Sequence, residues 1–236
     1  MAETALFKWR HYESEIILLC VRWYLRYSLS YRDLEEMMNE RGLSVDHTTI
    51  YRWVQAYAPE LERRIRPHLR PTNDSYRVDE TYIKVKGAWK YLYRAVDSTG
   101  QTIDFMLSAK RDARVAKRFF HKMLKAAKHQ TPRVINVDRN KAYPPAVEEL
   151  KEEGVLSVAS QLRRCKYLNN IVEQDHRFIK RRVNPGLGFF SFNTARRTIG
   201  GYEVMNMIRK GQIEGLRKGD IRGQVRFVES LFKVAA

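Results

Sequence analysis

Cysteine is scarce in this chain of 236 residues, which contains only Cys20 and Cys165. The two are far apart in the sequence, so they indicate neither a disulfide framework nor a zinc site, and a reducing compartment fits. Long apolar runs are also missing, because the run over residues 16–21 is too short to cross a bilayer and is followed by Arg22. The N-terminus lacks the pattern of a secretory signal. These absences predict a cytoplasmic protein that does not engage a membrane.

Acidic residues are under-represented. The chain carries 44 Lys and Arg against 27 Asp and Glu, a formal net charge of +17, and its sequence pI is about 10.0. Residues 161–236 alone hold 16 basic and 6 acidic side chains. Because basic side chains that neutralise phosphates release condensed counterions, such an excess indicates a polyanionic partner. Hydrophobic residues make up 44%, enough for a buried core.

The hydrophobic period changes near residues 67–74, where Pro, Asn, Asp and Ser cluster. Before this point the apolar residues recur at spacings of three and four, and after it they alternate. We therefore predict an all-α domain over residues 1–70 and an α/β domain over residues 71–236 that ends in a helical extension.

The first domain is typical of a helix-turn-helix module. Helices are predicted over residues 13–27, after an N-cap at Ser30 with Asp33 three residues on, and over 47–57. Gly42 ends the second of these helices and Asp46 caps the third. Polar side chains on the third helix are suited to hydrogen bonds with base edges or phosphates. The residues expected to contact DNA are His47, Thr48, Thr49, Tyr51, Arg52 and Gln55. A plain three-helix bundle with a polar face is the alternative.

The second domain is predicted to be a mixed sheet with helices. The expected strands cover residues 76–85, 89–96, 103–107, 133–138 and 156–160, and the expected helices cover 113–128, 142–153, 169–181 and 194–209. Three hairpin-type strands followed by alternating helices and strands give the order βββαβαβα. This is the order of ribonuclease H-like folds, which by analogy suggests the fold but not the chemistry.

Three acids stand at informative places in that order: Asp79 in the first strand, Asp138 at the end of a short apolar strand, and Glu173 on a helix. Carboxyl ends of neighbouring strands face one crevice, and carboxylates there suit Mg²⁺. Two such ions support an in-line displacement at phosphorus by water or by a 3′ hydroxyl. Glu80 should point to the opposite sheet face, so we expect only one of the adjacent pair to line the crevice and favour Asp79.

The helix that carries Glu173 also carries two cations on the same face, Arg177 at i+4 and Lys180 at i+7. Both are well placed to hold a DNA phosphate. Asp175 should point elsewhere and is interpreted as a surface or capping residue. The alternative for this helix is a Glu173–Arg177 ion pair on a solvated face.

With these residues the chain resembles the DDE transposases of the bacterial insertion sequence six family. The 34 residues between Asp138 and Glu173 match the spacing of that family, as does Lys180 seven residues after Glu173. The run "DRNKAY" departs from the family's Lys-Ala-Pro run beside the second acid. The stretches that carry the resemblance are "VRWYLRYSLSYRDLEEMMNERGLSVDHTTIYRWVQAYAPE", "VDETYIKVKGAWKYLYRAVDSTGQTIDF", "INVDRNKAY", "KYLNNIVEQDHRFIKRR" and "GYEVMNMIRKGQ".

The resemblance implies a helix-turn-helix domain that recognises terminal inverted repeats and a ribonuclease H-like domain that cleaves and joins DNA strands. It implies that Asp79, Asp138 and Glu173 are catalytic and hold two Mg²⁺ ions, with Mn²⁺ able to substitute. It also implies replicative transposition through cointegrates, double-stranded repeat and target DNA as partners, and a homo-oligomer, dimeric or larger, acting at the nucleoid of a bacterium or archaeon.

Two other interpretations remain open from the residues alone. One is an integrase or nuclease with the same fold, although an integrase normally carries a His/Cys zinc module. The other is a transcriptional regulator that uses the helix-turn-helix domain and leaves the three acids unexplained. Replacing Asp138 by alanine separates a transposase from a regulator, because only the transposase has strand transfer to lose.

Overall fold

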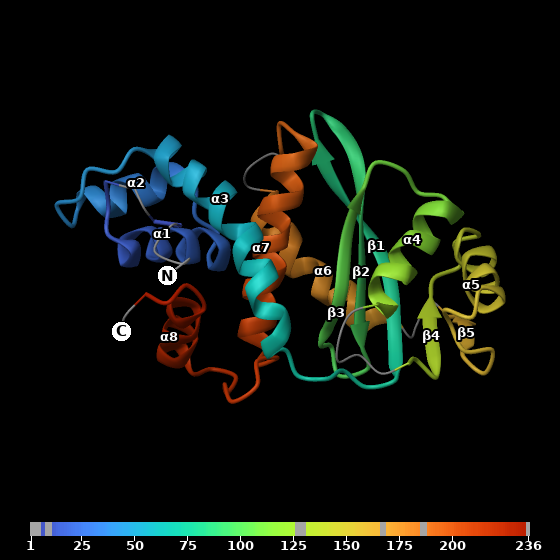
Figure 1. The fold of residues 1–236 in the computed structure, drawn as a ribbon. Coiled ribbons are helices and arrows are strands. Elements are labelled where there is room, and N and C mark those ends of the chain that lie inside the picture. Colours follow the sequence, from blue (N-terminus) through green and yellow to red (C-terminus); the bar gives the residue numbers. More distant parts are fainter. Residues whose placement is uncertain (1–5, 8–10, 126–130, 166–168, 185–187, 235–236) are drawn as a thin grey trace. The chain divides into compact units, whose positions relative to one another are not determined.

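The computed structural model describes residues 6–7, 11–125, 131–165, 169–184 and 188–234. The chain forms two compact units (Figure 1): residues 1–68 together with 193–236, and residues 69–192. Within the described ranges, no helix has both the length and the apolar composition that crossing a membrane requires.

The second unit is built on a five-stranded sheet in the order β3-β2-β1-β4-β5. β1 pairs antiparallel with β2, β2 pairs antiparallel with β3, and β4 and β5 continue the sheet parallel to β1. This mixed sheet and its helices have the ribonuclease H-like topology, so the predicted fold class is confirmed. The strands are β1 (Ser75–Val85), β2 (Ala88–Asp97), β3 (Thr102–Ser108), β4 (Val134–Val137) and β5 (Gln161–Arg164).

The fifth strand lies later than predicted. Residues 156–160, which were expected to form it, contain turns, and the strand begins at Gln161. In the observed register Leu162 lies opposite Ile135, which continues the sheet beyond the buried β4. Residues 156–160 include apolar side chains, which led to the prediction of a strand. Leu156 is buried in the core, but it does not join the sheet.

Helices cover both faces of the sheet. α4 (Ala113–Leu124) and α5 (Tyr143–Glu152) share a core with Val78 and Tyr93 on one face. α6 (Asn170–Val183) packs against β1 and β2. Because side chains alternate along a strand, the neighbours of that core pair, Asp79 and Arg94, point to the opposite face, toward α6. The predicted helix over 113–128 extends partly outside the described residues.

The first unit is helical. Ser30 and Asp33 form a reciprocal capping box, and Asp46 caps the third helix, as predicted. That helix runs on through Pro59 to Ile65 instead of ending near residue 57, because its apolar stripe continues. The helices are α1 (Ser14–Arg26), α2 (Tyr31–Asn39), α3 (His47–Ile65), the short 3₁₀ helix η1 (Arg66–His68), α7 (Phe192–Lys210) and α8 (Ile221–Leu231). The last of these was not predicted.

The C-terminal helices belong to this first unit, whereas the sequence was interpreted as attaching residues 193–236 to the α/β domain. Close packing of α7 explains the grouping. A Cβ atom on Gly201 would lie 2.6 Å from Leu25 Cδ2 and 2.9 Å from Ala58 Cβ, so only glycine lets α7 approach α1 and α3 this closely. The boundary near residue 70 therefore marks one of two chain crossings between the units.

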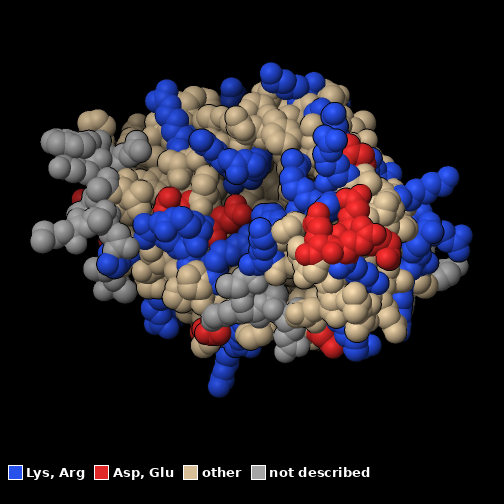
Figure 2. Space-filling view, turned by 45° about the vertical axis from the view of Figure 1, so that its right-hand side comes forward, with Lys and Arg blue, Asp and Glu red and all other residues tan. Residues whose placement is uncertain are grey.

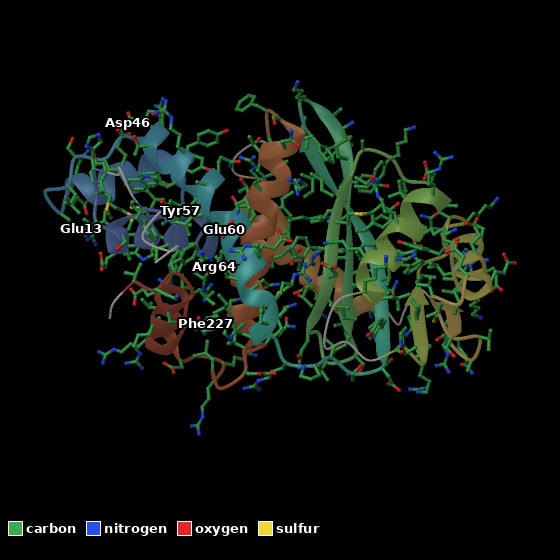
Figure 3. The ribbon with its side chains drawn as sticks, viewed as in Figure 1. Glu13, Asp46, Tyr57, Glu60, Arg64 and Phe227 are labelled. Atoms are coloured by element: carbon green, nitrogen blue, oxygen red, sulfur yellow. The ribbon has the colours of Figure 1, made fainter. Side chains whose placement is uncertain are left out.

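α8 is held on α3 by an aromatic and cationic contact (Figure 3). Figure 3 labels Tyr57 and Arg64, both on α3. The Tyr57 ring lies 6.0 Å from that of Phe232, in an edge-on arrangement. Arg64 donates a hydrogen bond of 2.6 Å to the carbonyl of Leu231 and lies over the Phe232 ring. These contacts anchor Leu231 and Phe232, at the C-terminal end of α8, to α3.

Candidate active site and DNA-binding residues

Strand pairing brings two of the predicted acids to neighbouring positions. β1 and β4 run parallel, and the last pair in their register is Arg77 opposite Asn136. Two residues further along each strand, the register leads to Asp79 and Asp138. Asp79 therefore lies in β1 near the edge of the sheet where β4 ends, and Asp138 is the first residue after β4.

Asp138 is fixed by the loop that follows β4. Its Oδ1 accepts a hydrogen bond of 2.9 Å from the backbone N–H of Asn140, and its Oδ2 lies 3.6 Å from an Arg111 guanidinium nitrogen. The side chain is 30% exposed, which leaves it open to a ligand. An Asp at the end of a buried strand is thus both oriented and accessible.

Glu80 is a buried carboxylate beside these acids. It is paired with Arg111 and accepts hydrogen bonds from the Tyr143 hydroxyl and, at 3.2 Å, from the Asn140 amide. Burial raises the pKa of Glu80, and Tyr143 and Arg111 oppose that rise. Burial, and then Glu80, also raise the pKa of Tyr143. With these partners Glu80 has a structural role.

A cavity of about 600 Å³ lies between β1 and α6. Asp79, Glu173, Arg177 and Lys180 line it, and Glu80 also borders it. The Glu80 side chain is 1% exposed and bonds to Tyr143 of α5, so it points to the opposite sheet face, as the alternation of the strand predicted. Asp138 lies outside this lining.

Glu173 and the two cations are exposed on one side of α6. Across the described part of the chain, neither Glu173 nor Arg177 nor Lys180 has an ion pair. The alternative of a Glu173–Arg177 pair is therefore not what the structure contains, and all three side chains are available to a ligand.

α6 is tied to the sheet by polar contacts. Asn169 donates a hydrogen bond of 3.2 Å to the carbonyl of Val78, one residue before the first acid. Asp175 pairs with Arg94 at 2.6 Å, so its interpretation as a surface or capping residue is wrong. The i+2 position does point away from Glu173, but it points into the sheet rather than to solvent.

The three predicted acids are not drawn together at one point. Of the described side chains, the one set of three acids or histidines whose ligand atoms all lie within 4.8 Å of one another is Glu35, Asp46 and His47. Asp79 instead contacts His176 at 3.3 Å, and Asp138 lies 3.6 Å from Arg111. Mutual repulsion of three carboxylates favours such separate partners.

On the predicted recognition helix, the structure excludes one residue. Gln55 is buried, and its amide donates a hydrogen bond of 2.9 Å to the hydroxyl of Thr198 on α7. The prediction that Gln55 contacts DNA is therefore wrong. Gln55 lies on the face of α3 that packs against α7, a helix that was predicted to belong to the other domain.

The other predicted DNA-contacting residues lie in the first two turns of α3. The ring Nδ1 of His47 lies 3.0 Å from a Glu35 oxygen, and Thr48 bonds to the capping Asp46. Arg52 is exposed and has no ion pair among the described residues. Thr49 is half-buried, and the exposed Tyr51 ring packs edge-on against Tyr31 at 5.5 Å.

Two residues near Asp79 were not predicted from the sequence. His176 contacts the Asp79 carboxylate, and Arg94 contacts His176. Arg94 is fully buried in β2, and His176 is nearly so on α6. A signal for Arg94 was present, because a charged residue interrupts the otherwise apolar run "YLYRAV". His176 gave none, since its helix is polar on several sides.

The strand order and the pocket together define a class of protein. A ribonuclease H-like sheet with acids at the end of β4, in β1 and on a following helix is the architecture of polynucleotidyl transferases of the DDE type.

Residues 73–212 match the family described as the DDE domain of IS240-type transposases. The transposase for insertion sequence-like element IS431mec of Staphylococcus aureus is 38% identical over 204 residues, covering 86% of this chain and 88% of the relative. The transposase for insertion sequence element IS257 in transposon Tn4003, also from Staphylococcus aureus, has the same identity and coverage.

Solved structures are similar at a lower level. The HTLV-2 integrase catalytic core domain in complex with magnesium has a TM-score of 0.41 and 17% identity, covering 54% of this chain and 84% of that one. The BIV integrase catalytic core domain has a TM-score of 0.41 and 14% identity, covering 66% and 98%. The fold assignment therefore depends on the strand order described above.

The chain belongs to the DDE transposases of the insertion sequence six family. It is a DDE-type polynucleotidyl transferase of DNA transposition, and enzymes of this type use a divalent metal. The regulator interpretation is thereby set aside.

Proposed function

We propose that Asp79, Asp138 and Glu173 are the catalytic acids and hold two Mg²⁺ ions, for which Mn²⁺ can substitute. The observation that carries this proposal is the cavity lined by Asp79, Glu173 and two cations, and Asp138 follows directly after β4, the strand that pairs with β1. The donor set fits, because Mg²⁺ prefers carboxylate oxygens. When bound, two such metal ions would activate the attacking oxygen and stabilise the leaving oxygen.

The protein's own side chains bind and orient the DNA. Arg177 and Lys180 neutralise a phosphate beside Glu173, which keeps the scissile bond in the cavity between β1 and α6. The Asn140 backbone N–H and the His176 ring hold the two aspartates by hydrogen bonds. The substrates are the terminal inverted repeats of the element and a target duplex, joined by a homo-oligomer, dimeric or larger, in a replicative reaction that forms cointegrates.

The chain's charge supports this choice of substrate. Figure 2 shows lysine and arginine side chains over much of the visible face, with acidic side chains gathered in a few places. A formal charge of +17 gives the salt-dependent attraction that duplex DNA requires.

A strand-transfer assay with the DNA ends that flank the gene tests the proposal. We expect joined products with Mg²⁺ or Mn²⁺, none in EDTA, and recovery when excess Mg²⁺ is restored. Joining that persists in EDTA would contradict the metal mechanism. End binding without joining under either metal would contradict the proposed activity of this chain.

We also propose that His47, Thr48, Thr49, Tyr51 and Arg52 read the inverted repeat. Replacing Arg52 by alanine should weaken repeat binding by about 1–3 kcal/mol and binding to unrelated DNA much less, because a base contact is lost. Replacing Lys180 should instead weaken binding to all sequences and lower the salt dependence.

Titrations of labelled repeat and scrambled DNA at several salt concentrations measure both effects. Arg63→Ala is the matched control, because this exposed arginine lies three turns further along α3 and already pairs with Glu60 at 2.8 Å. Equal losses for repeat and scrambled DNA in the Arg52 variant would mean that Arg52 contacts only phosphate.

A further inference from the structure

A continuous row of charged and polar side chains runs behind Asp79. Arg94 pairs with Asp175 at 2.6 Å, and another of its guanidinium nitrogens lies 3.3 Å from His176 Nδ1. The other ring nitrogen of His176, Nε2, lies 3.3 Å from Asp79 Oδ2. The row therefore leads from the interior of the second unit to a proposed metal ligand.

The direction of these hydrogen bonds follows from the chemistry of arginine. A guanidinium group has only N–H donors and no acceptor, so the His176 Nδ1 that faces it must present its lone pair. The ring hydrogen then sits on Nε2 and is donated to Asp79 Oδ2. Arg94 thus selects the tautomer of His176, and that tautomer supplies a donor to Asp79.

Burial makes the row rigid. Arg94 is 0% exposed and His176 6% exposed, so neither exchanges its partners for bulk water. Asp175 supplies the opposite charge that a buried guanidinium needs. Arg94 lies directly opposite Asp79 in the β1–β2 register, and both point toward α6, so the sheet itself fixes their spacing.

We propose that His176 is a positioning residue for the first acid. By donating from Nε2 to Oδ2, while the Glu80 backbone N–H donates to Oδ1 at 2.9 Å, it fixes the rotation of the Asp79 carboxylate and leaves the remaining lone pairs for a ligand. Arg94 and Asp175 act through His176 by holding its tautomer. The inference depends on the proposed role of Asp79 as a metal ligand.

Two amide substitutions separate positioning from packing. In His176→Gln the side-chain NH₂ takes the place of Nε2–H, whereas in His176→Asn it takes the place of Nδ1 and falls short of Asp79. We expect His176→Asn to lower strand transfer by about 10- to 100-fold and to raise the Mg²⁺ concentration for half-maximal activity. His176→Gln should recover most of both losses.

Equal loss in both variants, with thermal midpoints showing that both fold, would overturn the proposal, as would full activity in His176→Asn. Asp79→Asn distinguishes this failure from failure of the proposed function. If Asp79→Asn keeps its activity, the acid assignment itself is wrong. If Asp79→Asn is inactive while the histidine variants match the original chain, only the positioning role is lost.

The tautomer can be read directly in the unmodified protein. In ¹⁵N-histidine-labelled protein, correlation of ring nitrogens with ring protons should show His176 with hydrogen on Nε2 alone, with its signals assigned by their loss in His176→Gln. Hydrogen on Nδ1 alone would overturn the proposal without any variant. Arg94→Lys keeps the charge but removes the planar fork, and it should broaden or shift these signals.

Discussion

Asp138→Asn will abolish strand transfer, with a loss on the order of 10³-fold or more, while the folded chain still binds its DNA ends. The substitution removes a charge without removing shape. Asparagine keeps the oxygen that accepts from the Asn140 N–H at 2.9 Å, so the loop after β4 stays in place. What is lost is the anionic oxygen that a divalent cation requires.

The same reasoning predicts that Asp138→Asn is a mild change for stability. Arg111 lies 3.6 Å from Asp138 but is also paired with the buried Glu80, so the guanidinium keeps a counter-charge. A gel assay for joined products, run beside a binding titration and a thermal melt, measures the three properties separately. Glu153→Gln is a matched control, because it removes one exposed charge that also lies beside a cation, Lys117 at 2.8 Å, at the C-terminal end of α5.

If Asp138→Asn retains joining within a few-fold of the original chain, Asp138 is not a ligand and the acid set must be redrawn. A parallel loss of binding, joining and thermal midpoint would instead show that the substitution unfolds the second unit.

Gly201→Ala will destabilise the helical unit, and the adjacent Gly200→Ala will not. Both changes gain the same helix propensity, about 1 kcal/mol. At Gly201 the new Cβ would lie 2.6 Å from Leu25 and 2.9 Å from the Cβ of Ala58, whose position is fixed by its backbone. Overpacking of this kind costs about 1–3 kcal/mol.

At Gly200 the new Cβ meets only the carboxylate end of Glu62, which can rotate away. The difference in free energy of unfolding between the two variants therefore isolates the cost of overpacking, about 1–3 kcal/mol against Gly201→Ala. Urea titrations followed by circular dichroism measure it. Equal stability of the two variants would mean that α7 does not pack on α1 and α3 as closely as described.

Local signals in the sequence predicted much of the fold. The capping pair at Ser30 and Asp33, the cap at Asp46 and the alternation of β1 to β3 each depend on near neighbours, and all appear in the structure. The fifth strand was misplaced because a four-residue edge strand such as Gln161–Arg164 has little hydrophobic pattern of its own. Its position is set by pairing with β4.

Non-local contacts account for the other differences. Gln55 and Asp175 were both predicted to be exposed. Gln55 instead bonds to Thr198 and Asp175 to Arg94, and both partners are far away in the sequence. A single sequence carries no information on which distant segment covers a helix face. For the site, motif spacing predicted Asp79, Asp138 and Glu173, an assignment that remains a prediction, while His176 became visible only in three dimensions.

The helical unit is made from the two ends of the chain, with the whole α/β unit inserted between residues 68 and 193. During synthesis, α3 emerges long before the residues that cover it, so its apolar and amide groups wait for α7 and α8. A chain that stops before residue 193 therefore lacks both α7 and α8 and leaves the face of α3 that they cover exposed. The helical unit is completed only after the whole α/β unit has been synthesised.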